Sequence, residues 1–148
     1  MIIKSWLNNT LLVRQIGIGK AIGLVVGLAG FVLLPILAPG SSWLLRWGLL
    51  LWYVTLGALV AMACILTQPP ISKPPMPWWL VAAGLGAWMN FVLTFFAYDA
   101  MKTVLVAMLG ENGIMQSPFW FALEGAIVGL VIGYAVTRFG GQAAAADR

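Results

Sequence analysis

The ionisable side chain best placed to do chemistry is Glu124, which lies in an otherwise apolar segment. It follows Pro118 by six residues, roughly 9 Å along a helix at about 1.5 Å per residue. Ionisable groups inside a membrane are costly and usually face protein or water. Glu124 is therefore a candidate for a proton- or cation-coupled site or for a lipid head-group contact. The alternative is a structural carboxyl group, held by neighbouring polar side chains, that fixes helix register.

Three further polar residues, Asn90, Thr94 and Tyr98, recur at intervals of four in another apolar segment. This spacing places them on one face of a helix. Counted back from Tyr98, Thr94 lies about 6 Å and Asn90 about 12 Å along that helix, so the depth of Glu124 falls between them. The pattern predicts a candidate polar site formed by this stripe and Glu124.

Arg46, Asp99 and Lys102 complete the candidate polar site. At about 100° per residue, Asp99 points nearly opposite Asn90 and need not belong to the stripe. It can pair with Lys102, one turn further on, or with Arg46. The first pairing would be an exposed helix pair of little energetic value. Arg46 stands near two tryptophans, and the simpler interpretation is a side chain that extends to the membrane interface.

The chain has few residues that could bind a metal ion or haem or form a disulfide. It contains no His and a single Cys, Cys64, whereas a zinc site needs about four ligands, usually His or Cys. Cys64 lies in an apolar run, where it is expected to pack as a small hydrophobic residue. The eight Lys and Arg residues form no basic cluster of the kind that binds nucleic acid. We therefore expect no cofactor, metal or nucleic-acid partner and assign no catalytic residue; an enzyme is the least favoured class.

Membrane-spanning helices are the elements that must position these residues. Of the 148 residues, 62% are hydrophobic and 8% are charged, whereas soluble domains carry roughly 25% charged residues. The expected surroundings are therefore the lipid bilayer. Runs of about 18 or more apolar residues are long enough to cross it. They predict an all-α integral membrane protein with four transmembrane helices, at about 18–38, 43–66, 78–98 and 118–138.

Turn-forming residues separate these spans. Residues 39–42 read Pro-Gly-Ser-Ser and predict a tight turn. Residues 68–77 contain five of the eight prolines and predict a loop. The third span stays compatible with a helix as far as residue 109, which predicts an extension that projects beyond the membrane or bends along its surface. Residues 110–113 read Gly-Glu-Asn-Gly and end it.

The two ends of the chain differ in pattern from the spans. In residues 1–16, apolar residues recur every three to five positions with polar residues between them, which predicts an N-terminal interfacial amphipathic helix. The alternative is a helical extension of the first span. Residues 17–140 form a single four-helix domain, and residues 141–148 form an Ala-rich C-terminal tail.

The Lys and Arg residues predict the orientation in the membrane, because cytoplasmic loops carry an excess of them. With the N-terminus inside, six are cytoplasmic and two lie towards the other side. We therefore expect a multi-pass protein of the cell inner (plasma) membrane with both termini in the cytoplasm. The candidate polar site then lies in the outer half. The six are Lys4, Arg14, Lys20, Lys73, Arg138 and Arg148, and the two are Arg46 and Lys102.

Two triple-glycine faces form the strongest motif. Three glycines spaced by four residues occur in the first span and three in the fourth, and such spacing lets another helix backbone approach closely. In this glycine-zipper pattern, the two faces could pack against each other or one could meet another subunit. The residues are Gly19, Gly23 and Gly27, and Gly125, Gly129 and Gly133.

These patterns support two functional hypotheses. The first is a non-catalytic structural or accessory subunit of a larger membrane complex, held by glycine-face packing to other subunits or to copies of itself. The second is a small oligomeric transporter, channel or lipid translocator that uses the polar site around Glu124.

Overall fold

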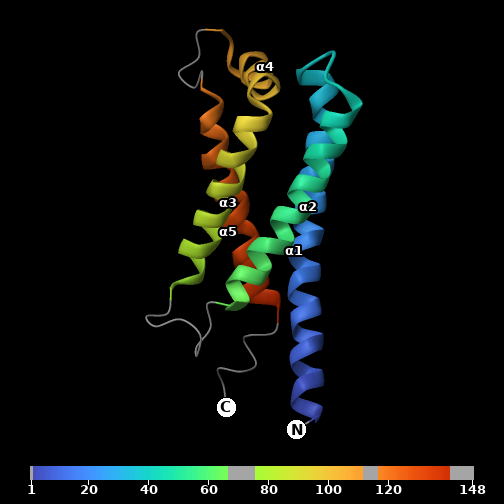
Figure 1. Ribbon diagram of the computed structural model, residues 1–148, viewed down its shortest axis with the longest axis vertical. Coiled ribbons are helices and arrows are strands. Elements are labelled where there is room, and N and C mark those ends of the chain that lie inside the picture. Colours follow the sequence, from blue (N-terminus) through green and yellow to red (C-terminus); the bar gives the residue numbers. More distant parts are fainter. Residues whose placement is uncertain (1, 67–75, 112–116, 141–148) are drawn as a thin grey trace.

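The computed structural model describes residues 2–66, 76–111 and 117–140, with side chains from residue 11 onward, and most of these residues are helical. Four long helices, α1 (Ile2–Leu37), α2 (Trp43–Leu66), α3 (Trp78–Phe96) and α5 (Phe121–Phe139), alternate in direction (Figure 1). Two short ones, α4 (Tyr98–Leu109) and η1 (Pro118–Trp120), lie between α3 and α5 in the chain. Four segments are long and apolar enough to cross a membrane. The prediction of an all-α chain with four candidate spans is confirmed at this level.

Helix α1 is continuous from Ile2 to Leu37. The separate interfacial helix predicted at 1–16 is therefore not confirmed, and these residues belong to α1 from Ile2 on, as in the alternative interpretation. The 36 residues of α1 make about 54 Å of helix, against a hydrocarbon core of about 30 Å. The candidate span covers only Leu11–Leu37. The N-terminal end of α1 accordingly projects past the ends of α2 and α5 (Figure 1).

The turn between α1 and α2 lies where the Pro-Gly-Ser-Ser sequence predicted it. Gly40 has a φ of 100°, a conformation that glycine adopts without a Cβ penalty. The Ser42 hydroxyl then accepts a hydrogen bond from the Leu45 backbone N–H at 3.1 Å, which caps the start of α2. Most of the predicted proline-rich loop, residues 68–75, lies outside the described residues. The same holds for residues 112–113 of the predicted break and for the tail 141–148.

The helical extension predicted after the third span bends away from it, which was one of the two alternatives, and the break lies at Ala97. Its backbone angles, φ −121° and ψ 26°, are not helical, and α4 turns across one end of the bundle (Figure 1). Met101, Val104 and Leu105 of α4 are buried, while Lys102 is exposed. Burial of this apolar face accounts for the bend, because a straight continuation would carry the face away from the other helices.

The long helices are grouped into two tightly packed pairs, α1 with α2 and α3 with α5, and the pairs make fewer contacts with each other. In the first pair, Gly19 lies against the Gly57 carbonyl group and Gly23 against that of Tyr53. Gly27 lies against Leu50. A methyl group at Gly19 or Gly23 would overlap these backbone oxygens, so the contact requires glycine.

The second pair is built in the same way. Gly125 lies against the Gly86 carbonyl oxygen, and Gly129 against that of Ala82. Gly133 lies against the side chains of Ala82 and Trp78. The two glycine faces therefore do not pack against each other, contrary to one expectation. Each face lies against the backbone of a neighbouring helix of the same chain. The spacing within a glycine face does not identify which helix that is.

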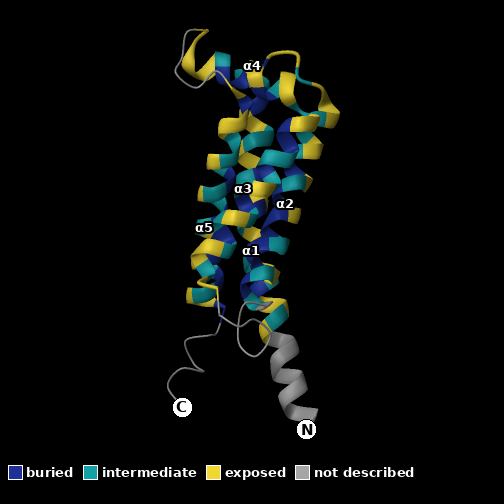
Figure 2. Cartoon of the chain, turned by 60° about the vertical axis from the view of Figure 1, so that its left-hand side comes forward, coloured by how far each residue is buried: buried dark blue, intermediate teal, exposed yellow. Residues whose placement is uncertain are grey.

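A hydrophobic core fills the half of the bundle nearer the N-terminal end of α1. Its buried residues come from α2, α3 and α5, with Ile18 and Ile22 of α1 packed against them. Buried positions lie on the helix faces that point into the bundle, and exposed positions lie on its outside (Figure 2). The core residues are Leu56, Val60, Ala61, Cys64, Ala82, Ile132 and Val136.

Substitution of Gly86 by Ala tests the close contact between α3 and α5. The added methyl group would overlap the Gly125 carbonyl oxygen, so the helices must separate, and overpacking of this kind costs about 1–3 kcal/mol. The control is Gly84→Ala on the same helix, where nothing lies within 4 Å and helix propensity favours Ala by up to about 1 kcal/mol. Thermal unfolding in a mild detergent compares them; equal unfolding temperatures would refute the contact.

Candidate functional site

The Glu124 carboxylate extends from α5 towards α2, where it meets Tyr53. The Tyr53 hydroxyl donates to this carboxylate, with its oxygen 2.9 Å from Oε1 and 3.0 Å from Oε2. The hydroxyl has one proton and lies at nearly equal distances from the two oxygens, so both are within its reach. Tyr53 is 6% exposed. This contact links the helix pair α1–α2 to the pair α3–α5 through a buried phenol and a half-buried carboxylate.

Asn90 on α3 extends the contact into a network of three helices. Its side chain is fully buried, and its amide nitrogen lies 3.1 Å from the Phe121 carbonyl oxygen, 3.3 Å from the Tyr53 hydroxyl and 3.4 Å from Glu124 Oε2. Its carbonyl oxygen accepts a hydrogen bond from the Trp52 indole N–H at 3.3 Å. Both ends of the amide are thus satisfied, as buried polar groups require.

Thr94 is buried close to this network but does not bond to Glu124. Its hydroxyl donates to the Asn90 backbone carbonyl at 2.9 Å, within α3, and lies 3.5 Å from the Pro118 carbonyl oxygen. The predicted stripe therefore supplies one direct partner of Glu124, which is Asn90, and one residue that packs beside it.

The other predicted members of the site lie elsewhere. Tyr98 belongs to α4 and is 41% exposed, with its ring 6.1 Å from that of Phe119. Asp99 and Lys102 are exposed on α4, where the negative charge of Asp99 in the first turn favours the helix dipole. The bend at Ala97 takes these three residues off the α3 face, so the structure separates them from Glu124.

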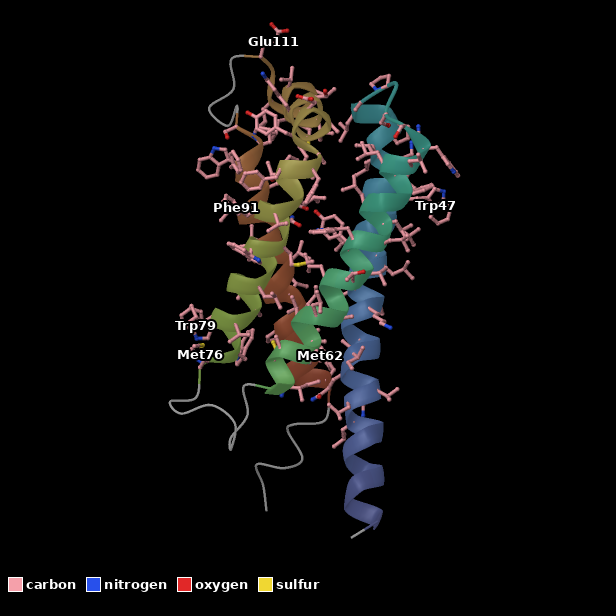
Figure 3. The ribbon with its side chains drawn as sticks, in the orientation of Figure 1. Trp47, Met62, Met76, Trp79, Phe91 and Glu111 are labelled. Atoms are coloured by element: carbon pink, nitrogen blue, oxygen red, sulfur yellow. The ribbon has the colours of Figure 1, made fainter. Side chains whose placement is uncertain are left out.

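Arg46 also lies apart from the network. Its guanidinium carbon is 5.9 Å from the centre of the Trp43 ring, within cation–π range. Trp43, Trp47 and Phe31 make edge-to-face ring contacts with one another, where α1 ends and α2 begins. Figure 3 shows Trp47 on the outside of the bundle. The Arg46 Nε atom is itself buried and has no hydrogen-bond partner among the described residues, and the interpretation of Arg46 as an interfacial side chain stays a prediction.

Tyr53 and Trp52 are the site residues that the sequence reasoning missed. They follow Trp43, the first residue of α2, by ten and nine residues, about 15 Å along the helix. Tyr and Trp are enriched at the membrane interface, where their polar atoms reach water. A tyrosine this deep in a span needs an internal partner, and that signal could have indicated Tyr53.

A cavity of about 260 Å³ adjoins Glu124 and Tyr53. Its lining residues belong to both helix pairs and to α4, so it lies between the pairs at the α4 end of the bundle. Side chains of α1, α2, α4 and α5 line it, among them Leu34, Leu49 and Met101. Among these lining residues, only Tyr53 and Glu124 have polar side chains. The cavity is thus an apolar space with one polar point on its wall.

The Glu124 carboxylate at the cavity wall accepts hydrogen bonds and has no basic residue among its hydrogen-bond partners. An ionised carboxylate offers about four acceptor positions, and here neutral donors from Tyr53 and Asn90 use only part of them. Within the described residues, no group of three or more His, Cys, Asp or Glu could hold a metal ion. The geometry suits a ligand that donates a hydrogen bond or brings a positive charge.

Comparison of the chain with protein-family models, with curated proteins and with solved structures finds no match.

A double-mutant cycle tests the bond between Tyr53 and Glu124. We expect Tyr53→Phe to destabilise the protein by about 1–3 kcal/mol, because the carboxylate loses its closest donor in a buried site. In a Glu124→Leu background the same change should cost clearly less, because the hydroxyl then has the Asn90 amide as a partner and no carboxylate. Thermal unfolding of the four proteins in one detergent measures the coupling; equal costs in both backgrounds would show that the two groups are independent.

Proposed function

We propose that this chain is a multi-pass membrane protein that binds a small amphipathic molecule between its helix pairs, as the binding step of transport or lipid translocation. The observation that carries the proposal is the cavity of about 260 Å³ whose apolar wall has a single polar point, at Tyr53 and Glu124. Ligand sites are typically concave, largely apolar and equipped with a few placed polar groups. The apolar wall accepts the body of the ligand, and the polar point holds its head.

The size of the cavity limits the ligand. An apolar cavity of about 150 Å³ is large enough for benzene. By that scale, a cavity of about 260 Å³ holds about ten non-hydrogen atoms. A whole phospholipid is far larger, so a lipid could place only a segment of itself here. A small amine, alcohol or similar amphiphile fits entirely.

Transport through alternating access is a better account than a permanent channel. The half of the bundle away from α4 is filled by the hydrophobic core, in which Leu56, Val60 and Ile132 are fully buried. The core cluster is hydrophobic, so among the described residues it offers no charged group to a ligand that moves from Glu124 towards the N-terminal end of α1. Movement of a ligand past this core requires the helix pairs to shift relative to each other.

The proposed orientation puts the cavity in the outer half of the inner (plasma) membrane, with both termini in the cytoplasm. It is supported by the six-to-two division of Lys and Arg. It also agrees with the fold, in which the start of α1 and the end of α5 lie at the same end of the bundle and α4 at the other (Figure 1). The first residues of α1 would then lie in or beyond the cytoplasmic interface, where an amphipathic helical segment is stable.

Cysteine labelling tests this orientation. In a Cys64→Ser background, we expect Lys102→Cys on α4 to react with a membrane-impermeant maleimide added to intact cells, because Lys102 is exposed at the outer end. Gln142→Cys should react only after the cells are opened. The reverse pattern would invert the orientation.

An accessory subunit remains the second candidate. Its first support, a glycine face open to a partner, is weakened because each glycine face lies against a helix of the same chain. Its remaining support is the length of α1, about 54 Å, which provides a helical surface beyond the bundle for a partner. Stoichiometric foreign subunits after purification in mild detergent would favour this candidate.

Filling the cavity tests the binding function. Gly30 lines the cavity and has nothing within 4 Å of an added Cβ, so Gly30→Phe should occupy the space without disturbing the backbone. The matched control is Gly48→Phe on α2. Gly48 is exposed, and a Cβ added there also has nothing within 4 Å. We expect Gly30→Phe to weaken n-octanol binding at least about tenfold and Gly48→Phe to leave it unchanged. Calorimetry in phosphatidylcholine nanodiscs, corrected for empty discs, measures the affinity. Equal binding by both variants would refute the cavity as the site and favour the accessory role.

A further inference from the structure

We propose that the ligand of this cavity carries a cationic amine head on its apolar body, and that Glu124 binds this head in exchange for a proton. The inference rests on the proposed binding function and adds the class of ligand. It follows from the charges around the cavity, from the unused acceptor capacity of the carboxylate and from the apolar character of the remaining wall.

The first argument is the lack of a positive charge near Glu124. No Lys, Arg or His lines the cavity. The hydrogen-bond partners of Glu124 are a phenol and an amide, both neutral. An ionised carboxylate at this depth is costly unless a positive charge compensates it. A proton or a cationic ligand can supply that compensation, and the described part of the chain supplies no other source.

The second argument is the geometry of the carboxylate. The Tyr53 hydroxyl lies within hydrogen-bond distance of both oxygens, and Asn90 lies at 3.4 Å from Oε2. These contacts occupy up to three of about four acceptor positions, so at least one remains for a ligand. An ammonium group brings N–H donors and a full charge, so it satisfies the remaining position and the charge together. An anionic head would place two like charges in one apolar site.

The third argument concerns competition with protons. The groups that face Glu124 are Tyr53 from α2 and Asn90 from α3, while α1 and α4 contribute apolar side chains to the cavity. Asp99 and Lys102 of α4 are exposed outside it. Glu124 is therefore the group whose protonation decides whether the cavity is neutral or negative. A cation and a proton exclude each other there, so binding of the cation must weaken as the pH falls.

Three probes of one tail length test the inference in phosphatidylcholine nanodiscs: n-octylammonium, n-octanol and n-octanoate. Calorimetry, corrected for empty discs, gives each affinity from pH 5 to pH 8, a range in which the alkylammonium stays charged. We expect n-octylammonium to bind the native protein about ten- to a hundredfold more tightly than n-octanol at pH 8, as for a charged hydrogen-bonded contact. This preference should shrink as the pH falls. n-Octanoate should bind most weakly.

Two variants show whether Glu124 is responsible. Glu124→Gln should bring the affinities for n-octylammonium and n-octanol within about a factor of two of each other and remove the pH dependence. Asp99→Asn, which neutralises an exposed acid outside the cavity, should keep the native preference. The pH series on the native protein needs no variant, so the inference stays testable if Glu124→Gln misfolds.

The outcomes separate this inference from the proposed function. Equal or tighter binding of n-octanol by the native protein would overturn the cationic ligand while the cavity remained a binding site. A cation preference that survives Glu124→Gln would likewise overturn the role of Glu124. Binding of none of the probes, or binding that Gly30→Phe does not reduce, would overturn the proposed function itself.

Discussion

Close backbone contact between glycine-bearing helices is the constraint on which the rest of this structure depends. In lipid, burial of apolar surface does not drive helices together, so association relies on van der Waals contact and hydrogen bonds. At Gly23 against the Tyr53 carbonyl group, and at Gly129 against that of Ala82, the backbones approach more closely than any side chain would permit. The contacts define two helix pairs whose internal geometry leaves little freedom.

Between the pairs, side chains mediate the contact, and the two halves of the bundle differ as a result. Towards the N-terminal end of α1, a hydrophobic core occupies this space, with Leu56, Val60 and Ile132 fully buried in it. Towards α4 the pairs leave the cavity, and the network around Glu124 lies at its wall. The carboxylate ties the pairs together through Tyr53, and in the proposed function it also binds the head of the ligand. A structural and a ligand-binding role for Glu124 need not compete.

Much of the architecture follows from local properties of the sequence. The apolar runs predicted the second span as 43–66, which are the bounds of α2, because a long apolar segment without breakers has few alternatives to a helix in lipid. Pro39 and Gly40 marked the first turn because their backbone preferences are intrinsic to the residue types. Glu124 and Asn90 were identified as site residues because polar groups at that depth need partners.

The sequence by itself therefore determined the helices, the first turn and the polar residues that require burial, because these depend on residue type and on spacing along one helix. Only the tertiary structure decided which helices pair, since a glycine face does not specify the helix that meets it. It also decided that the chain bends at Ala97, because the apolar face of α4 becomes buried there. Ala97 is neither Gly nor Pro, so its residue type does not predict a break. That bend separates Tyr98, Asp99 and Lys102 from Glu124, and the pairing of helices brings Tyr53 to it across 71 residues of chain.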